Sequence, residues 1–188
     1  METYAIKNLS FRYPETGIDV LKDITFSVNE GEFITVCGPS GCGKSTLLRH
    51  LKPDLSPHGV LSGEIFFEEK PISDLSHREQ SSKIGFVMQS PENQIVTDKV
   101  WHELAFGLES LGYDNNTIRK RVAETASFFF FFYYFEKSVL ELSGGQKQIL
   151  NLASIMAMQP SVLILDEPTS QLDPIAASEF LHCVSLIN

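Results

Sequence analysis

The chain has 188 residues, 43% of them hydrophobic, which is typical of one globular domain with a sizeable core. Its formal net charge of −9 argues against a nucleic-acid partner, because phosphate backbones recruit basic surfaces. The sequence has no apolar run long enough to span a bilayer, and METYAIKNLS at its start lacks the layout of a secretion signal. We therefore expect a domain that stays in the cytosol unless a partner holds it at a membrane.

The first third of the chain predicts a β-rich region around a glycine-rich loop. Residues 3–11 and 24–28 are rich in β-forming side chains, and PETG between them is typical of a turn. The apolar run FITVC at 33–37 predicts a strand that leads directly into the loop. Residues 44–52 then follow a helical pattern that ends before Pro53.

The remaining sequence predicts a mixture of strands and helices. Strands are expected over 60–72, with a turn at EEKP, and over 84–89. Helical patterns follow from about 95 to 127 and over 144–159. SVLILDEP is an apolar strand that ends on acids, as in a buried parallel sheet, and Asp173 is a plausible N-cap for a last helix.

One segment, FFFFFYYF at 128–135, has no helical or strand period. Each aromatic side chain offers about 150–250 Å² of surface, whereas the largest apolar patch on a monomer is usually ~300–600 Å². We therefore expect the run to be buried or covered by a partner. A low-complexity stretch is the alternative, and we assign the run no chemistry.

GPSGCGKST follows a predicted strand and opens a predicted helix. In this context the glycines let successive backbone N–H groups point at a phosphate. The lysine is placed to reach the β- and γ-phosphates, and the serine after it offers a hydroxyl to Mg²⁺. The loop therefore predicts a site for ATP and Mg²⁺ formed by Gly38, Pro39, Ser40, Gly41, Cys42, Gly43, Lys44, Ser45 and Thr46.

Two acids, Asp166 and Glu167, follow the apolar strand VLIL. Their carboxylates should emerge at the carboxyl edge of a sheet, where ligands bind in open α/β folds. We expect Asp166 to hold Mg²⁺, directly or through water, and Glu167 to polarise the attacking water. Without the phosphate loop, the same pair would be explained equally well as solvated acids at a strand end.

LSGGQ at 142–146 is the most specific element, and with it the chain resembles the ATP-binding subunit of an ABC transporter over essentially its whole length. The resemblance implies an α/β P-loop NTPase fold with a RecA-like parallel-sheet core, an N-terminal antiparallel β subdomain and an inserted helical subdomain. It implies one ABC ATPase domain over 1–188. In it, 1–88 form the β subdomain and P-loop core, 89–143 the helical subdomain, and 144–188 the signature helix, Walker B strand and D-loop.

The same resemblance assigns roles to further residues. In this family the signature contacts the γ-phosphate bound by an opposing ABC ATPase subunit, whether identical or related. The residues that match this role are Ser143, Gly144, Gly145 and Gln146. Gln89 matches the glutamine that senses Mg²⁺ and water, so the implied catalytic residues are Lys44, Gln89 and Glu167, and the implied metal ligands are Ser45, Gln89 and Asp166.

Two other positions match less specific features of the family. SQLD at 170–173 matches the D-loop, which implies that Asp173 crosses the dimer interface. Tyr13, in FRYP, matches the aromatic residue that stacks on adenine, with a core aromatic as the alternative.

The segments FRYPETG and QSPENQIVTDKVWHELAFGLESLG resemble the energy-coupling-factor (ECF) importers of vitamins and transition-metal ions. This resemblance implies a transmembrane coupling component and a separate substrate-binding membrane protein as partners. It also implies a peripheral position on the cytoplasmic face of the cell membrane, with Gln94 and the following helix near the membrane contact.

The chain departs from the family pattern in three places, one of which is the aromatic run at 128–135, which replaces the mixed sequence that normally precedes the signature. The family's switch His follows another strand beyond the D-loop, whereas this chain stops at Asn188, and His182 lies too early and is expected at the surface. Ile149 stands where the family usually has an Arg. The leading expectation is an ATPase that powers an ECF-type importer. The alternatives are a non-transport ABC ATPase of DNA repair or translation, and a C-terminally truncated, nucleotide-binding fragment without turnover.

Overall fold

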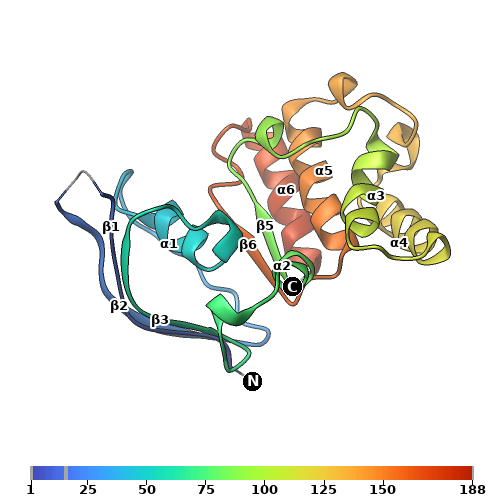
Figure 1. The fold of residues 1–188 in the computed structure, drawn as a ribbon. Coiled ribbons are helices and arrows are strands. Elements are labelled where there is room, and N and C mark those ends of the chain that lie inside the picture. The colour runs from blue at the N-terminus through green and yellow to red at the C-terminus, as the bar shows by residue number, and fades with distance from the viewer. Residues whose placement is uncertain (1, 15–16, 188) are drawn as a thin grey trace. The chain divides into compact units, whose positions relative to one another are not determined.

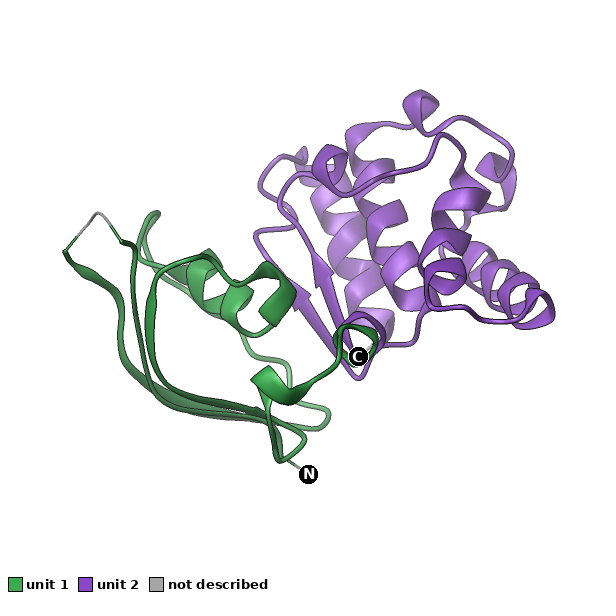
Figure 2. Cartoon of the chain, in the orientation of Figure 1, with its two compact units in different colours: residues 1–80 green, residues 81–188 purple. Residues whose placement is uncertain are grey.

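The computed structural model of the chain describes residues 2–14 and 17–187. The chain divides into two compact units, 1–80 and 81–188, which are coloured separately in Figure 2. The predicted phosphate loop belongs to the first unit. The predicted Asp–Glu pair and the LSGGQ segment belong to the second.

The first unit is built on an antiparallel sheet with the strand order β2-β1-β3-β4. Its strands are β1 (Glu2–Arg12), β2 (Asp19–Asn29), β3 (Val60–Phe67) and β4 (Lys70–Pro71). The central strand β1 buries Tyr4, Ile6, Leu9 and Phe11. Apolar side chains on one face of this sheet thus form the core of the unit, which confirms the expected N-terminal strands.

Helix α1 (Lys44–His50) begins at the end of the glycine-rich loop (Figure 1). It is tied to the sheet because the buried hydroxyl of Tyr4 donates a hydrogen bond to the Leu51 carbonyl oxygen, 2.6 Å away. Burial raises the pKa of the Tyr4 hydroxyl, so it remains a donor throughout the physiological pH range. The short elements that follow are η1 (Pro53–Leu55), η2 (Ile72–Asp74) and α2 (His77–Lys83). Helix α2 was not predicted from the sequence.

The strand expected over residues 33–37 is absent, and this prediction is wrong. Residues 33–38 have no regular secondary structure, and Phe33, Ile34 and Val36 are exposed by 63%, 46% and 39%. An apolar β-forming run becomes a strand only when another strand satisfies its backbone N–H and C=O groups. No strand among the described residues pairs with this one.

The second unit contains the two expected strands as a parallel pair, β5 (Ile84–Val87) and β6 (Val162–Leu165). Strand β5 is buried throughout, whereas in β6 only Ile164 is buried and the other three residues are partly exposed. Their register aligns Ile84 with Val162 and Val87 with Leu165. Both strands therefore end at the same edge of the sheet. The segment that contains Gln89 and the segment that contains Asp166 leave the sheet side by side.

Helices form the rest of the second unit, and α5 is central because it packs against α3, α4, α6 and β5 (Figure 1). The helices are α3 (Val100–Ser110), α4 (Asn115–Phe128), α5 (Gly144–Ala157) and α6 (Pro174–Ile187), with the short turns η3 (Pro91–Asn93), η4 (Phe131–Tyr134) and η5 (Val139–Glu141) between them. Leu104, Leu108, Leu150 and Leu152 are completely buried at its centre. These helices match the expected helical segments.

The aromatic run is divided between core and surface. Phe129 and Phe131 are buried in the core of the second unit. Phe130, Phe132 and Tyr133 are exposed by 78%, 76% and 86%. Burial of the whole run, one of the two expectations, is therefore wrong, because a short non-periodic segment can turn only some of its side chains inward.

Two further observations concern exposure and membranes. His182 on α6 is exposed, as expected. Among residues 2–14 and 17–187, no helix combines the length and the apolar character needed to cross a bilayer.

Candidate functional site

The first part of the candidate site is the loop that ends at helix α1. Gly43 precedes the helix with a φ of 99°, and its carbonyl oxygen accepts from the Leu47 N–H at 2.9 Å. A Cβ atom at this position would lie 3.0 Å from the Val20 carbonyl oxygen and 3.1 Å from a methyl carbon of the same residue. Both the left-handed conformation and the close approach require glycine here. Gly43 therefore sets the turn by which the loop enters helix α1, and phosphate binding by the loop stays a prediction.

Lys44 lies across this loop rather than away from it. Its ammonium group donates to the carbonyl oxygens of Gly38 and Pro39 at 3.1 and 3.2 Å. Ser45 and Thr46 follow in the first turn of α1, and Thr46 is buried. The cation and the two hydroxyls that were predicted to bind phosphate and Mg²⁺ are thus grouped at one end of a helix.

Tyr13 lies beside the same helix. Its hydroxyl is 3.2 Å from the Thr46 hydroxyl, and its ring packs edge-to-face on Phe11 at a centroid distance of 4.9 Å. The side chain is half-buried. This contact brings the predicted adenine-stacking residue to the phosphate loop, and the stacking itself stays a prediction.

The second part of the site lies at the carboxyl edge of β5 and β6. The Asp166 N–H donates to the Val87 carbonyl oxygen at 3.0 Å, which extends the strand pairing by one step and leaves Asp166 buried. Glu167 is exposed, and its carboxylate accepts a hydrogen bond from the Gln89 side-chain amide at 3.4 Å. The structure therefore brings together the three residues that the sequence predicted from separate motifs.

These residues fit a magnesium ion by their chemistry. Mg²⁺ prefers hard oxygen ligands, usually one or two carboxylates or hydroxyls completed by water and substrate phosphates. Asp166 and Gln89 offer a carboxylate and an amide oxygen in the second unit, and Ser45 offers a hydroxyl in the first. The residues predicted as metal ligands supply the donor types that this ion binds.

The LSGGQ segment forms the start of α5. Ser143 is its N-cap: its hydroxyl oxygen accepts from the Gln146 N–H at 3.3 Å, and the Gln146 side chain accepts from the Ser143 N–H at 2.9 Å. Gly145 lies so close to α6 that a Cβ there would be 2.6 Å from the Ala176 methyl. Asp173 caps α6 by accepting from the N–H groups of Ile175 and Ala176. The predicted signature and D-loop residues thus lie at the starts of two packed helices.

Sequence reasoning missed how the segment after β5 is held. The side-chain amide of Gln94 donates to the Phe86 carbonyl oxygen at 2.8 Å and accepts from the Met88 N–H at 2.9 Å. Its expected place near a membrane contact stays a prediction. The buried carboxylate of Glu103 accepts from the N–H groups of Val96 and Thr97. The only sequence signal for these contacts is Glu103 itself, a charged residue on the face of the helix that is otherwise apolar.

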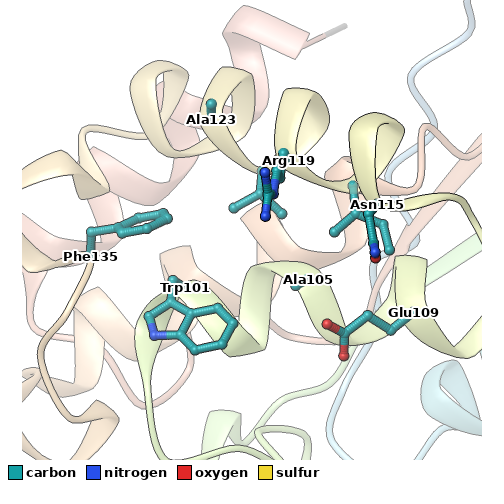
Figure 3. Close-up of a pocket in the computed structure, with 9 residues that line it drawn as sticks. Trp101, Ala105, Glu109, Asn115, Arg119, Ala123 and Phe135 are labelled. Atoms are coloured by element: carbon teal, nitrogen blue, oxygen red, sulfur yellow. The ribbon is translucent and has the colours of Figure 1, made fainter.

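A cavity of about 380 Å³ lies between α3 and α4 (Figure 3). Trp101 and Phe135 form one side of it, and Glu109 and Arg119 supply its charges. It is lined by Trp101, Ala105, Glu109, Asn115, Ile118, Arg119, Val122, Ala123 and Phe135. None of these residues belongs to the predicted nucleotide site.

Comparison with known proteins agrees with this arrangement of motifs. The family model described as ABC transporter matches residues 21–170. An ABC transporter ATP-binding protein of Bacillus anthracis is 48% identical over 183 residues, which is 97% of this chain and 33% of that protein. The HMP/thiamine import ATP-binding protein YkoD of Bacillus subtilis is 40% identical over 185 residues, or 96% of this chain and 34% of that protein. The chain thus spans about a third of the length of these curated relatives.

Solved structures show the same likeness. CbiO1 of Clostridium perfringens, part of the ABC transporter complex CbiONQ, has a TM-score of 0.86 at 33% identity, covering 99% of this chain and 73% of that one. The ATP-binding cassette MJ0796, a dimer in a post-hydrolysis state with ADP and Pi, has a TM-score of 0.80 at 25% identity, covering 98% and 82%. The fold is therefore the α/β fold of ABC ATPases, as predicted. Because the family model spans most of its length, the chain belongs to the ABC transporter family of ATP-binding domains.

Proposed function

We propose that this chain binds MgATP and hydrolyses it as the ATP-binding part of an ABC transporter. The observation that carries this proposal is the presence in one chain of two features, each described within its own unit. A glycine-rich loop with Lys44 across it opens helix α1. A buried Asp166 and an exposed Glu167, in contact with Gln89, end the parallel strand pair.

The residues divide the work by their chemistry. The backbone N–H groups of 38–46 and the Lys44 ammonium would hold the β- and γ-phosphates. Ser45, Gln89 and Asp166 would hold Mg²⁺, which neutralises charge on the phosphates when bound. Glu167 would orient and polarise the attacking water, with Gln89 positioning both. An exposed carboxylate at a strand edge suits that role because it is accessible to water and to a nucleotide.

We extend the proposal to a head-to-tail dimer of two such domains. Ser143 presents a hydroxyl, and Gly144 and Gly145 present N–H groups, at a helix N-terminus that suits an anion. We propose that they contact the γ-phosphate held by the other subunit, with Asp173 near the interface. The dimeric state described for the similar cassette MJ0796 supports this arrangement.

The finer assignment is an importer of the ECF type at the cytoplasmic face of the cell membrane. Its support is the likeness to YkoD and to CbiO1, whose descriptions name HMP/thiamine import and a CbiONQ complex. We propose that a transmembrane coupling component docks against α3, where the cavity beside Trp101 offers an apolar surface with two charged groups. A separate membrane protein would then bind the transported vitamin or metal ion.

The experiment is a thermal-unfolding series with MgATP beside a phosphate-release assay on the same chain. Ligand at about 100 times its Kd stabilises a protein by ~2.7 kcal/mol, which should raise the melting temperature by roughly 5–10 °C at this size. The absence of a shift would contradict nucleotide binding. A shift without phosphate release would support a nucleotide-binding domain that has no turnover of its own.

A further inference from the structure

The segment after β5 holds Gln89 but has little secondary structure of its own. Only the short turn η3 (Pro91–Asn93) is regular between Val87 and α3. Its conformation must therefore be set by side chains that reach its backbone. Gln94 provides one such contact from within the segment, Glu103 of α3 holds the N–H groups of Val96 and Thr97, and further contacts come from helix α5.

Three residues of α5 bind this segment. Gln148 donates from its side-chain amide to the Met88 carbonyl at 2.9 Å, and Asn151 donates to the Pro91 carbonyl at 3.4 Å. Lys147 forms an ion pair with Glu92 at 3.0 Å. Figure 1 shows the segment that leaves β5 running past the first turns of α5. The three contacts reach Met88, Pro91 and Glu92, on both sides of Gln89 and Ser90 in the segment.

Burial of the side-chain amides of Gln148 and Asn151 lowers the stability of the fold. Gln148 and Asn151 are both completely buried, three residues apart on one face of α5, among core leucines. Each uses its donor, but within the described residues neither Gln148 Oε1 nor Asn151 Oδ1 has a hydrogen-bond partner. A buried acceptor without a partner lowers stability, so an apolar side chain would serve packing better. The amides are better explained by what they hold than by what they contribute to stability.

Helix α5 links this contact to the LSGGQ segment. The helix starts at the Ser143 cap, and Gln148 lies about 7.5 Å further along its axis at 1.5 Å per residue. Met88 is followed directly by Gln89, whose amide contacts the Glu167 carboxylate. A displacement at the start of α5 must therefore move the Met88 carbonyl and, with it, the Gln89 side chain.

From this geometry we propose that Gln148 and Asn151 are positioning residues for hydrolysis. Through their hydrogen bonds to Met88 and Pro91, they make the orientation of Gln89 toward Glu167 depend on the position of helix α5, which begins after Ser143. A phosphate contact at the LSGGQ end of α5 is thereby transmitted to the residues that orient the attacking water. The inference rests on the proposed function, because it assigns Gln148 and Asn151 a place in that same reaction.

The test compares Gln148→Met and Asn151→Leu with Gln80→Met as a matched control. Gln80 is also a buried amide, and it makes two backbone hydrogen bonds, to Leu75 and Asp54. Steady-state ATP hydrolysis is measured first. We expect kcat to fall about 10- to 100-fold in the α5 variants with KM changed less than about twofold, as for a misplaced catalytic group. Gln80→Met should keep the kcat of the parent chain, so a loss of kcat that is equal in all three would contradict the proposal.

Hydrogen exchange of residues 86–94 gives a readout that does not need turnover. Without nucleotide, this segment should exchange about fivefold faster in Gln148→Met, because one buried hydrogen bond that orders it is lost. In the parent chain MgATP should slow this exchange, and in Gln148→Met it should not. Unchanged exchange in Gln148→Met would overturn the proposal. If MgATP has no effect on the exchange of a parent chain that hydrolyses ATP, the coupling fails and the proposed function stands. A parent chain that shows neither a thermal shift with MgATP nor phosphate release contradicts the proposed function itself.

Discussion

The two units build their parts of the site by different means. In the first unit the loop enters helix α1 through a backbone feature, the left-handed conformation of Gly43 against the Val20 carbonyl. In the second unit the segment that contains Gln89 is shaped by the side chains of Gln94 and Gln148.

This difference fits the chemistry that we propose for each part. A phosphate is recognised by many equivalent N–H groups, which a glycine-rich backbone supplies without specific side chains. A water and a metal ion need one amide and two carboxylates in defined orientations, which side-chain contacts must hold. We therefore expect the first unit to be sensitive to backbone conformation and the second to be sensitive to the polar atoms of its side chains.

The largest expected effect is on turnover in the second unit. Glu167→Gln keeps the shape of the side chain but removes the carboxylate that polarises water. We expect phosphate release to fall about 100- to 10,000-fold, with MgATP affinity within about twofold of the parent chain. Glu141→Gln, an exposed acid outside the site, should leave the rate unchanged. Retained hydrolysis in Glu167→Gln would place the base elsewhere.

The next effect is on binding in the first unit. Gly43→Ala forces a left-handed conformation that costs ~1–2 kcal/mol and pushes a methyl group against Val20. MgATP affinity, measured by titration calorimetry, should fall about ten- to a hundredfold. Gly112→Ala has a similar φ but open space around it and lies in the second unit, so it should bind MgATP like the parent chain. Equal losses in both variants would show that the effect is one of stability.

A third, smaller effect is a pH dependence of folding stability that arises in the first unit. His50 is 3% exposed, packs on the Phe11 ring, and bonds through Nδ1 to the Ser56 hydroxyl at 2.6 Å. Burial lowers its pKa below the ordinary value of 6.5. The unfolded chain therefore binds this proton first, and stability falls as pH drops from about 6.5 toward the lower folded-state pKa.

Urea unfolding at pH 7.5, 6.5 and 5.5, followed by circular dichroism, measures this dependence. His50→Phe should flatten it below pH 6.5, whereas His182→Phe, at an exposed position of the second unit, should not. The same slope in His50→Phe and the parent chain would mean that another group causes the dependence.

The smallest effect concerns a helix cap in the second unit. The Asp114 carboxylate accepts from the N–H groups of Asn116 and Thr117 and from the Thr117 hydroxyl. These hydrogen bonds lower its pKa, first of all those from Thr117, so its stabilisation is present at neutral pH and lost as pH falls through the folded-state pKa. Asp114→Ala should lower the melting temperature by about 2–4 °C, and Asp114→Asn by less, because asparagine also caps helices. Equal melting temperatures for all three chains would exclude the cap as a source of stability.

Much of the fold could be predicted because the signals are local. Apolar periodicity and turn residues indicated most strands and helices, including the Asp173 cap of α6 and the strands β5 and β6. The phosphate loop and the Asp166–Glu167 pair could be predicted for the same reason, since each is a short run of residues with one chemical use. Helix α2 was missed because its seven polar-rich residues carry no apolar period.

The sequence by itself thus determined which residues are candidates to bind phosphate, metal and water, because these abilities belong to side chains and to short backbone segments. Only the tertiary structure decided what depends on distant partners. Residues 33–37 have the composition of a strand but no described strand to pair with, and the aromatic run divides between core and surface. Gln148 meets Met88 across 60 positions of sequence, and no local pattern encodes such a contact. The physical reason is that strand pairing, burial and buried hydrogen bonds are properties of two segments together.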